Sequence, residues 1–377
     1  MKLPHHTSRV ARRIFFFIHL WTGLILGLWF VMIGLTGSSL AWPELIAAEM
    51  RAMFPLEKTA TQTSQISLSE AVASFKKDQT GVTDQEMAFV ILPNYRFPFY
   101  IFSRPNKPYP YTLFLVDPYS GKVNPPRQVI DFTTGKLEHL HINLIMEAKG
   151  LIANGIASFF TLFMLLSGLW LWWPSNLNQL KLRLSIKRKA SFPRFIKDLH
   201  NVLGIYLYAI LLVTTVTAVV LAYNGSTQDS IEKALDGSVA SKPVTVKPSG
   251  QRLTDDELIK RASVALPQTL LLYVKRPVKS DEPYQVMFEH NGKGFWREGT
   301  LNLDPYTGKT ISIERDSQAS RGHKTMALVE DLHVGLFGGL WSKILYTIAG
   351  FLPLGLFATG VLMWWRKKRL KMKGYSH

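Results

Sequence analysis

Four long apolar stretches dominate the hydropathy pattern of this chain of 377 residues. Each is longer than the roughly 20 residues that an α-helix needs to cross the hydrocarbon core of a bilayer. The second and the fourth are each preceded by a short helix outside the membrane. The pattern therefore predicts four transmembrane helices, with these short helices included, at 14–42, 138–173, 195–223 and 330–365.

The first stretch follows Arg9, Arg12 and Arg13 and so has the order of a secretory signal peptide. Its apolar part runs for about 28 residues, which is too long for the apolar region of a cleavable signal. Trp42-Pro43-Glu44 is also a poor cleavage site. We therefore expect a retained helix.

Two long polar segments separate the apolar stretches, and they follow one plan. Each contains a capping box, Ser67-x-x-Glu70 or Thr254-x-x-Glu257, which opens a short helix. Strand-like stretches follow, and each set ends in an Asp-Pro-Tyr-Ser/Thr-Gly-Lys turn. The pattern predicts two α+β domains, at 43–137 and 224–329. Their strands are expected at 88–92, 99–103, 113–116, 270–275, 285–289 and 300–303.

The shared plan extends into the apolar stretches as an internal repeat. The capping boxes and the turns recur at an offset of 187 residues, and the second and fourth helices align without a gap at an offset of 192. Two copies that start on the same side of a membrane imply a pseudo-two-fold axis along the membrane normal. Equivalent residues of the two halves should then face each other.

Charge sets the orientation, because Lys and Arg accumulate on the cytoplasmic side of membrane segments. Residues 1–13, the loop 174–194 with the start of the third helix, and the tail 366–377 carry nearly all of the formal net charge of +17. We expect a bacterial inner-membrane protein with both termini cytoplasmic and the large domains periplasmic. Basic residues beside membrane ends suit anionic lipid, so we expect no nucleic acid partner.

The chain contains no cysteine. This excludes disulfide frameworks, iron–sulfur clusters and covalently attached c-type haem. Any haem would be b-type and held by side chains.

Four of the ten histidines occupy equivalent positions near helix ends: His19 with His200, and His141 with His333. Gly23 and Gly204 follow the first pair by one helical turn and remove bulk on the same face, which leaves room for a flat macrocycle. Ionisable residues in membrane segments are usually functional. Close helix packing with one interhelical hydrogen bond per histidine is the alternative.

The distance between the histidines of one half decides which of them can pair as ligands. His19 lies about 22 residues from the outer end of its helix, or roughly 33 Å, and His141 lies beyond that end. Ligation within one half is therefore excluded. We expect two b-type haems, one held by His19 and His200 on the inner side and one by His141 and His333 on the outer side.

Several neighbours are expected to support these ligands. His139 is the competing ligand candidate at the outer haem, but its counterpart is Asp331, so we expect it to lie beside the haem as a supporting residue. Glu138 and Glu330 share a helical face with the outer ligands and could accept their N–H, although helix capping explains them equally well. Arg12, Arg13, Arg194 and Lys197 could meet haem propionates or snorkel to lipid phosphate. The Trp residues at 170, 172, 173, 364 and 365 should form an interfacial belt. The other histidines, His5, His6, His290, His323 and His377, are expected to be solvated.

A family resemblance rests on Arg12-Arg13, His19-x-x-x-Gly23, Gly34-x-x-Gly37, the Asp-Pro-Tyr turns and the Gly-x-x-x-Trp-Trp helix ends. Together they resemble the PepSY-associated transmembrane family over nearly the whole chain, with Ala218 standing where the repeat would place Gly37. The single-chain arrangement is similar to that of inner-membrane ferric-siderophore reductases in this family. The resemblance implies PepSY-like external domains, b-type haem and electron transfer to a periplasmic ferric siderophore.

We therefore expect a ferric-siderophore reductase that takes electrons from an unknown cytoplasmic or membrane donor. Two other classes stay open. A permease component of iron uptake is compatible with the parallel repeat, but we expect no broken helix or intramembrane acid, and four helices leave little room for a path. A non-redox regulatory protein would use its external domains to bind a peptide or a protease.

Overall fold

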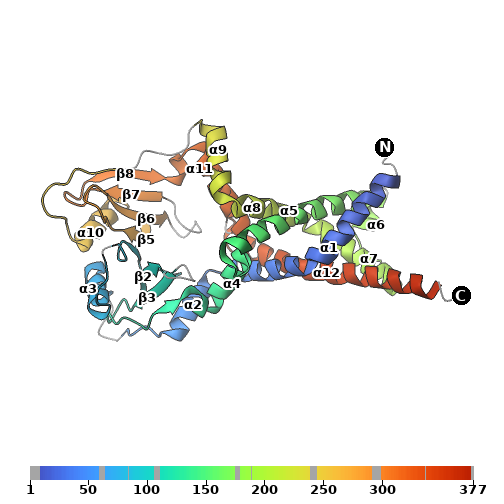
Figure 1. The fold of residues 1–377 in the computed structure, drawn as a ribbon, viewed down its shortest axis with the longest axis horizontal. Helices are drawn as coiled ribbons and strands as arrows, with labels where there is room; N and C mark the ends of the chain where they lie inside the picture. The colour runs from blue at the N-terminus through green and yellow to red at the C-terminus, as the bar shows by residue number, and fades with distance from the viewer. Residues whose placement is uncertain are drawn as a thin grey trace. The chain divides into compact units, whose positions relative to one another are not determined.

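A computed structural model describes residues 9–58, 64–83, 85–105, 111–174, 179–187, 189–237, 244–290, 299–335 and 337–374. His5, His6 and His377 lie outside these residues. The chain forms two compact units (Figure 1). The helical unit comprises Met1–Ala41, Leu137–Thr227 and Leu332–His377, and the sheet unit comprises Trp42–Lys136 and Gln228–Asp331.

Apolar helices build the helical unit. Among the described residues, α1 (Arg9–Leu40), α5 (Glu147–Trp172) and α12 (Gly339–Gly374) are each long and apolar enough to cross a membrane. The fourth candidate is the pair α7 (Phe192–Tyr206) and α8 (Tyr208–Ala222), which is bent by 60°. The described residues thus contain three helices that could span a membrane, or four if the bent pair is one span.

The bend corrects the prediction of a continuous third helix at 195–223. The backbone leaves the helical region at Leu207, with φ −112° and ψ 15°. The Tyr206 hydroxyl donates a hydrogen bond to the carbonyl of Leu184 at 3.1 Å, which ties the end of α7 to the segment after α6 (Leu180–Arg183). The expectation of unbroken membrane helices is therefore wrong for the third segment. Helix α12 contains Pro353 but continues through it.

Small residues let α1 and α12 approach closely. A Cβ on Gly34 would lie 2.4 Å from the carbonyl oxygen of Gly350, and a Cβ on Gly350 would lie 1.9 Å from the Ser38 hydroxyl. Ser38 donates to the carbonyls of Gly34 and Thr347, both at 3.0 Å. Small residues at such crossings are typical of membrane bundles, because packing replaces the hydrophobic effect between helices.

The sheet unit contains one antiparallel sheet of eight strands in the order β4-β3-β2-β1-β5-β6-β7-β8. The first half contributes four strands and the second half the other four. They join where β1 pairs with β5, with Val90 opposite Val274. The strands are β1 (Phe89–Ile91), β2 (Tyr100–Pro105), β3 (Tyr111–Val116), β4 (Arg127–Gln128), β5 (Thr269–Lys275), β6 (Tyr284–His290), β7 (Gly299–Leu303) and β8 (Thr310–Arg315).

This pairing corrects the expectation of two separate α+β domains. Without this pairing, β1 and β5 would each be an edge strand of its half, and an open edge exposes backbone N–H and C=O groups that favour pairing with another strand. Pairing β1 with β5 satisfies both edges at once. The six predicted strands are confirmed, whereas β4 and β8 were not predicted.

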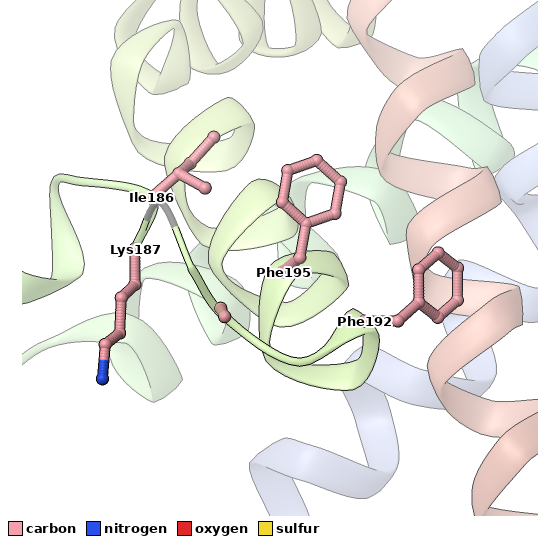
Figure 2. Close-up of a pocket in the computed structure, with 5 residues that line it drawn as sticks. Ile186, Lys187, Phe192 and Phe195 are labelled. Carbon is pink, nitrogen blue, oxygen red and sulfur yellow. The ribbon is translucent and has the colours of Figure 1, made fainter.

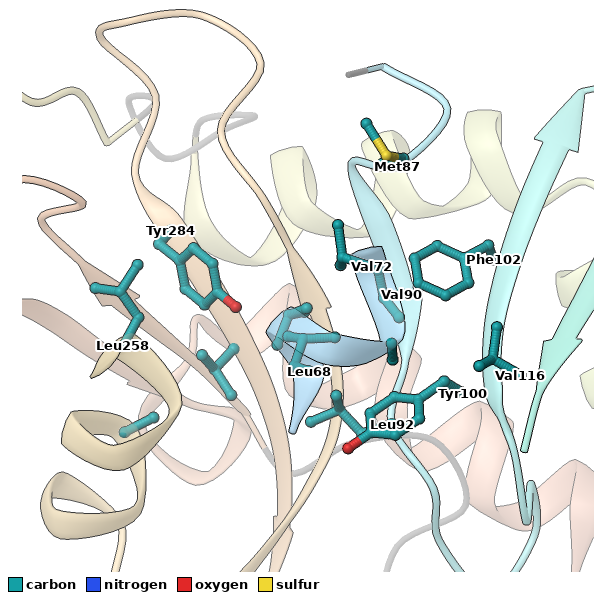
Figure 3. Packing of buried hydrophobic residues seen from close by; sticks show 14 of the residues in the cluster. Leu68, Val72, Met87, Val90, Leu92, Tyr100, Phe102, Val116, Leu258 and Tyr284 are labelled. Atoms are coloured by element: carbon teal, nitrogen blue, oxygen red, sulfur yellow. The ribbon is translucent and has the colours of Figure 1, made fainter. Parts of the chain in front are cut away.

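Helices cover the sheet on faces set by the alternation of its residues. The capping boxes are confirmed: Ser67 opens α3 (Leu68–Asp78) and Thr254 opens α10 (Asp255–Ala265). Both helices pack on the face that carries Phe102 and Val286 (Figure 3). The neighbouring residue Ile101 packs on the other face against α2 (Glu44–Met53). The remaining helices are α4 (Thr133–Asn143), α9 (Asn224–Asp236) and α11 (Arg321–Val334).

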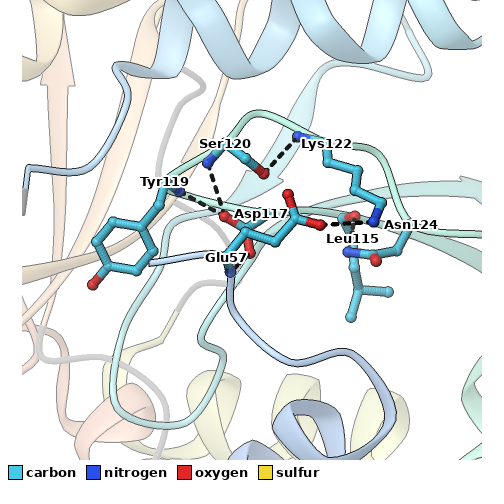
Figure 4. Close-up of polar contacts among 7 residues, drawn as sticks. All are labelled: Glu57, Leu115, Asp117, Tyr119, Ser120, Lys122 and Asn124. Carbon is cyan, nitrogen blue, oxygen red and sulfur yellow. Dashed lines mark hydrogen bonds and ion pairs between the residues drawn. The ribbon is translucent and has the colours of Figure 1, made fainter. Parts of the chain in front are cut away.

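The predicted Asp-Pro-Tyr turns are present after β3 and β7. Asp117 accepts hydrogen bonds from the backbone N–H of Tyr119 and Ser120, at 2.8 and 2.9 Å, and from that of Glu57 at 2.9 Å (Figure 4). Gly121 takes a φ of +73° and its counterpart Gly308 a φ of +68°. Glycine is favoured there because other residues pay a steric cost at positive φ.

We expect Gly34→Ala to destabilise the helical unit by about 1–3 kcal/mol, since the new methyl group forces a backbone out of close contact. Gly355→Ala is the matched control, because its Cβ would meet only the movable side-chain end of Leu203. Thermal unfolding in detergent measures the difference. Equal melting temperatures for the two variants would contradict the close crossing.

Candidate functional site

The helical unit brings together the histidines that the repeat makes equivalent. The ring centroids of His19 on α1 and His200 on α7 lie 6.2 Å apart, with an interplanar angle of 89°. Those of His141 on α4 and His333 on α11 lie 6.1 Å apart, with an angle of 51°. The helical unit therefore contains two separate imidazole pairs, each with one ring from either half of the chain.

In all four rings Nδ1 has a hydrogen-bond partner. His19 Nδ1 lies 3.0 Å from the carbonyl oxygen of Met164. The other three lie next to threonine hydroxyls: His200 at 2.8 Å from Thr359, His141 at 3.0 Å from Thr36 and His333 at 3.0 Å from Thr217. These partners were not predicted from the sequence.

The partners determine the tautomer. A carbonyl can only accept, so His19 must carry its proton on Nδ1. The threonine hydroxyls each donate to a carbonyl one turn earlier: Thr359 to Gly355 at 2.7 Å, Thr36 to Met32 at 2.9 Å and Thr217 to Val213 at 2.8 Å. They therefore accept from the imidazoles. This leaves the Nε2 lone pair of every ring free for a metal ion.

Side chains of α5 and α12 hold the helix ends that carry the second pair. Asn154 donates to the carbonyls of His141 and Ile142, at 2.6 and 3.0 Å, and accepts from the Trp29 indole at 2.9 Å. At the equivalent position of the other half, the Tyr346 hydroxyl donates to the carbonyl of Leu332. Each contact fixes the end of the helix that carries the histidine.

Burial dominates the electrostatics of this pair. It lowers the pKa of both His141 and His333 to about 4, because the charged imidazolium would lose its hydration. Both rings are therefore neutral at pH 7, as a metal ligand must be.

A cavity of about 1270 Å³ adjoins the first pair. Its lining includes His19, His200, Gly23 and Gly204. A Cβ on either glycine would reach only ordinary contact, 3.6 Å from Met164 Sδ for Gly23 and 3.7 Å from Leu356 for Gly204. Both glycines therefore lie in the cavity wall without close contact to the opposite side chains.

Two other glycines lie in close contact with the imidazole rings of His19 and His141. A Cβ on Gly168 would lie 2.9 Å from His19 Cε1, and one on Gly37 would lie 2.9 Å from His141 Cε1. The missing side chain at each glycine allows the helix backbone to approach the imidazole closely. The Gly-x-x-x-Trp-Trp motif contains Gly168, but sequence reasoning gave it no role at the histidines.

Two buried polar atoms that line the cavity lack a hydrogen-bond partner, the Trp172 indole N–H and the Tyr208 hydroxyl. Trp364 also lines the cavity, whereas Trp170, Trp173 and Trp365 are about half exposed, as an interfacial belt requires. An unpaired buried donor is costly, so these atoms fit a polar ligand in the cavity.

Basic residues line the same cavity: Arg9, Arg12, Arg13, Lys197, Lys367 and Lys368. Arg194, also predicted here, has another role. It pairs at 2.8 Å with the carboxylate of Asp198, which is only 5% exposed. Asp198 is an acid inside the bent pair of helices, which further weakens the expectation of acid-free membrane segments.

The contacts of the second pair differ from those considered for Glu138 and His139. His141 Nδ1 contacts the Thr36 hydroxyl at 3.0 Å and the Ile33 carbonyl at 3.2 Å. These two groups stand where Glu138 was considered as the acceptor. Burial raises the pKa of Glu138. No described contact brings the His139 side chain to these rings, and His323 lies at the start of α11 in the sheet unit.

Other sites in the described part of the chain offer less chemistry. There, no group of three or more His, Cys, Asp and Glu side chains could hold a metal ion. A hollow of about 620 Å³ beside α7 is lined by Ile186, Lys187, Ala190, Phe192 and Phe195 (Figure 2). Its lining supplies carbon surface and one amine, so it suits lipid rather than redox chemistry.

We expect Arg194→Gln to lower the free energy of unfolding by about 1 kcal/mol, because it leaves a buried carboxylate without its cation while Arg194 itself is half exposed. The cavity should be unchanged. Lys181→Gln, an exposed substitution in the same basic region, is the control for chemical or thermal unfolding. A loss no larger than that of the control would contradict a structural role.

Residues 16–367 match the PepSY-associated TM region. No curated protein sequence matches the chain. The matched span includes all four paired histidines and most of the chain, so this membrane protein belongs to the PepSY-associated transmembrane family.

Proposed function

We propose that this protein is a di-haem b reductase of the bacterial inner membrane, which passes electrons across the membrane to a periplasmic ferric siderophore and releases ferrous iron. One observation carries the proposal: two imidazole pairs, each formed across the halves of the chain, have every Nδ1 occupied and every Nε2 available.

The spacing of the rings fits axial ligation of haem iron. A metal ion about 2 Å from each of two imidazole nitrogens places the ring centroids roughly 6 Å apart. The observed separations are 6.2 and 6.1 Å. A hydrogen-bonded histidine pair that merely packed would bring one Nδ1 to the other ring. Here each Nδ1 bonds instead to its own half.

The surroundings of the first pair also fit a haem. Gly23 and Gly204 border the cavity without filling it, and the basic residues at its rim suit two propionates. The unpaired Trp172 N–H is a further donor for a carboxylate. When bound, the haems would supply one-electron transfer. The protein holds the ligands in one tautomer and shields the site from water.

The proposed reaction is a one-electron reduction of chelated ferric iron. One electron from a cytoplasmic or membrane reductant converts one chelated ferric ion to ferrous ion, which the chelator holds more weakly. The ferric siderophore rests on the family resemblance and not on a docking site. Histidines His19 and His200 would serve the cytoplasmic side, and His141 and His333 the periplasmic side, as the distribution of basic residues indicates.

The bent third helix favours one other candidate. Broken helices and buried acids occur in transporters, so Leu207 and Asp198 make an iron-uptake permease component the second hypothesis. A regulatory PepSY protein without redox activity is the third. Neither of these requires neutral imidazoles at 6 Å with free Nε2 atoms.

The purified protein should show a Soret band that shifts on reduction with dithionite, with two haems per chain by pyridine haemochrome assay. A preparation loaded with haem during expression that shows no such band would refute the redox proposal. It would leave the permease and regulatory hypotheses.

Removing single ligands should separate the two haems. His19→Ala and His200→Ala should each remove about half of the haem absorbance, and His141→Ala or His333→Ala should remove the other half, because a bis-imidazole site loses its haem with one ligand. His323→Ala, from the start of α11, is the matched control and should keep both. Loss of both haems from every variant except this control would indicate unfolding instead of ligation.

The substrate is tested by stopped-flow oxidation of the dithionite-free reduced protein. Ferrioxamine and other ferric siderophores should reoxidise it, with ferrous iron captured by ferrozine. Variants lacking His141 or His333 should lose this reaction while keeping the His19–His200 haem. Reoxidation by oxygen alone, with no ferric chelate active, would contradict the proposed substrate.

A further inference from the structure

Three threonine hydroxyls contact the proposed haem ligands, and nothing in the family resemblance assigns them a role. Thr359 contacts His200, Thr36 contacts His141 and Thr217 contacts His333, at 2.8–3.0 Å. We propose that these threonines are positioning residues that fix the imidazole tautomers and lower the reduction potentials of the haem irons. The inference rests on the proposed function and extends it to residues outside the ligand set.

The three threonine hydroxyls can act only as hydrogen-bond acceptors toward the imidazoles. A free hydroxyl could either donate to an imidazole or accept from it, and the two outcomes select opposite tautomers. Each of these hydroxyls already donates to carbonyls of its own helix: Thr359 to Gly355 and Leu356, Thr36 to Met32 and Ile33, and Thr217 to Val213 and Thr214. Only their lone pairs remain for the ring, so Nδ1 carries the proton and the lone pair of Nε2 would be the one to bind iron.

The positions of Thr36 and Thr217 follow the repeat. Thr36 lies 17 positions after His19, and Thr217 lies 17 positions after His200. The first membrane segment of each half therefore carries a ligand for one haem and a hydroxyl for a ligand of the other haem. The Gly34-x-x-Gly37 motif frames Thr36, although sequence reasoning used only its glycines.

The fourth ring has a backbone partner in place of a hydroxyl. His19 Nδ1 meets the carbonyl of Met164, and the residue equivalent to Thr359 in that half is Ser167, which donates to the same carbonyl at 2.9 Å. Backbone groups also bond to the other three rings: Ile33 to His141 at 3.2 Å, Leu356 to His200 and Thr214 to His333. The hydroxyl is therefore the added acceptor at these three rings, and it is the one that a substitution can remove.

The effect on the iron follows from charge. An acceptor at Nδ1–H makes the imidazole more basic and stabilises the ferric over the ferrous state. Removing the acceptor should therefore raise the reduction potential of that haem. Thr359 should act on the His19–His200 haem alone, and Thr36 and Thr217 on the His141–His333 haem alone.

The experiment compares Thr→Val and Thr→Ser at each position in the full-length protein. Valine has the shape of threonine without the hydroxyl, whereas serine keeps it. Thr161→Val on α5 is the matched control, because Thr161 is also buried and donates to the carbonyl of Ala157 at 2.9 Å but contacts no histidine among the described residues. Spectroelectrochemical titration gives the two midpoint potentials, and low-temperature EPR reports the axial geometry of each ferric haem.

We expect Thr359→Val to shift one midpoint upward and change the EPR signal of that haem, and Thr36→Val or Thr217→Val to do so for the other haem. The serine variants and Thr161→Val should match the wild type. If a valine variant loses its haem while the serine variant keeps it, the positioning role is also supported. Haem loss in both variants would overturn it, because the hydroxyl would then not be the deciding group.

Failure of this inference is distinguishable from failure of the proposed function. A wild-type protein with two haems whose midpoints and EPR signals do not respond to the valine substitutions overturns the positioning role alone. A wild-type protein without haem overturns both. A shift of both haems by a single substitution would also contradict the assignment of Thr359 to one site and of Thr36 and Thr217 to the other.

Discussion

The candidate site depends on one property of imidazole: it has two nitrogens, and a neutral ring donates from one and accepts at the other. In this protein Nδ1 of each histidine bonds within its own half, to Met164, Thr36, Thr359 or Thr217. Nε2 is thereby left as the accepting nitrogen of each ring. The hydrogen bonds hold together the helices of each half, and the ring pairs connect the halves.

The sheet follows the same division between contacts within a half and contacts across the halves. Strands β1–β4 pair among themselves, as do β5–β8, and the single pairing between the sets is that of β1 with β5. Backbone hydrogen bonds satisfy this junction, and side chains from both sets, such as Phe102 and Val286, share one core. The two units thus join the halves by different means, one by backbone pairing and the other by helix packing and facing rings.

Sequence reasoning reached much of this arrangement because periodicity and repetition are local or comparative signals. Apolar length identified α1, α5 and α12, capping boxes identified α3 and α10, and equivalence under the repeat selected His19 with His200 and His141 with His333. Contacts between residues far apart in the chain could not be predicted from these signals. The pairing of β1 with β5 requires knowing which edges are open. The break at Leu207 follows Gly204, which was interpreted as space for a macrocycle and not as a point where the helix ends.

The partners of the histidines were missed for a more instructive reason. Glu138 and Glu330 were considered as acceptors because they share a helical face with the outer histidines, with helix capping as the equal alternative. Inside a membrane bundle a charged partner pays a large desolvation cost, whereas a threonine that already donates to its own helix is a neutral acceptor with its donor satisfied. Threonines spaced 17 positions after a repeated histidine are therefore a signal that a sequence search for such sites can use.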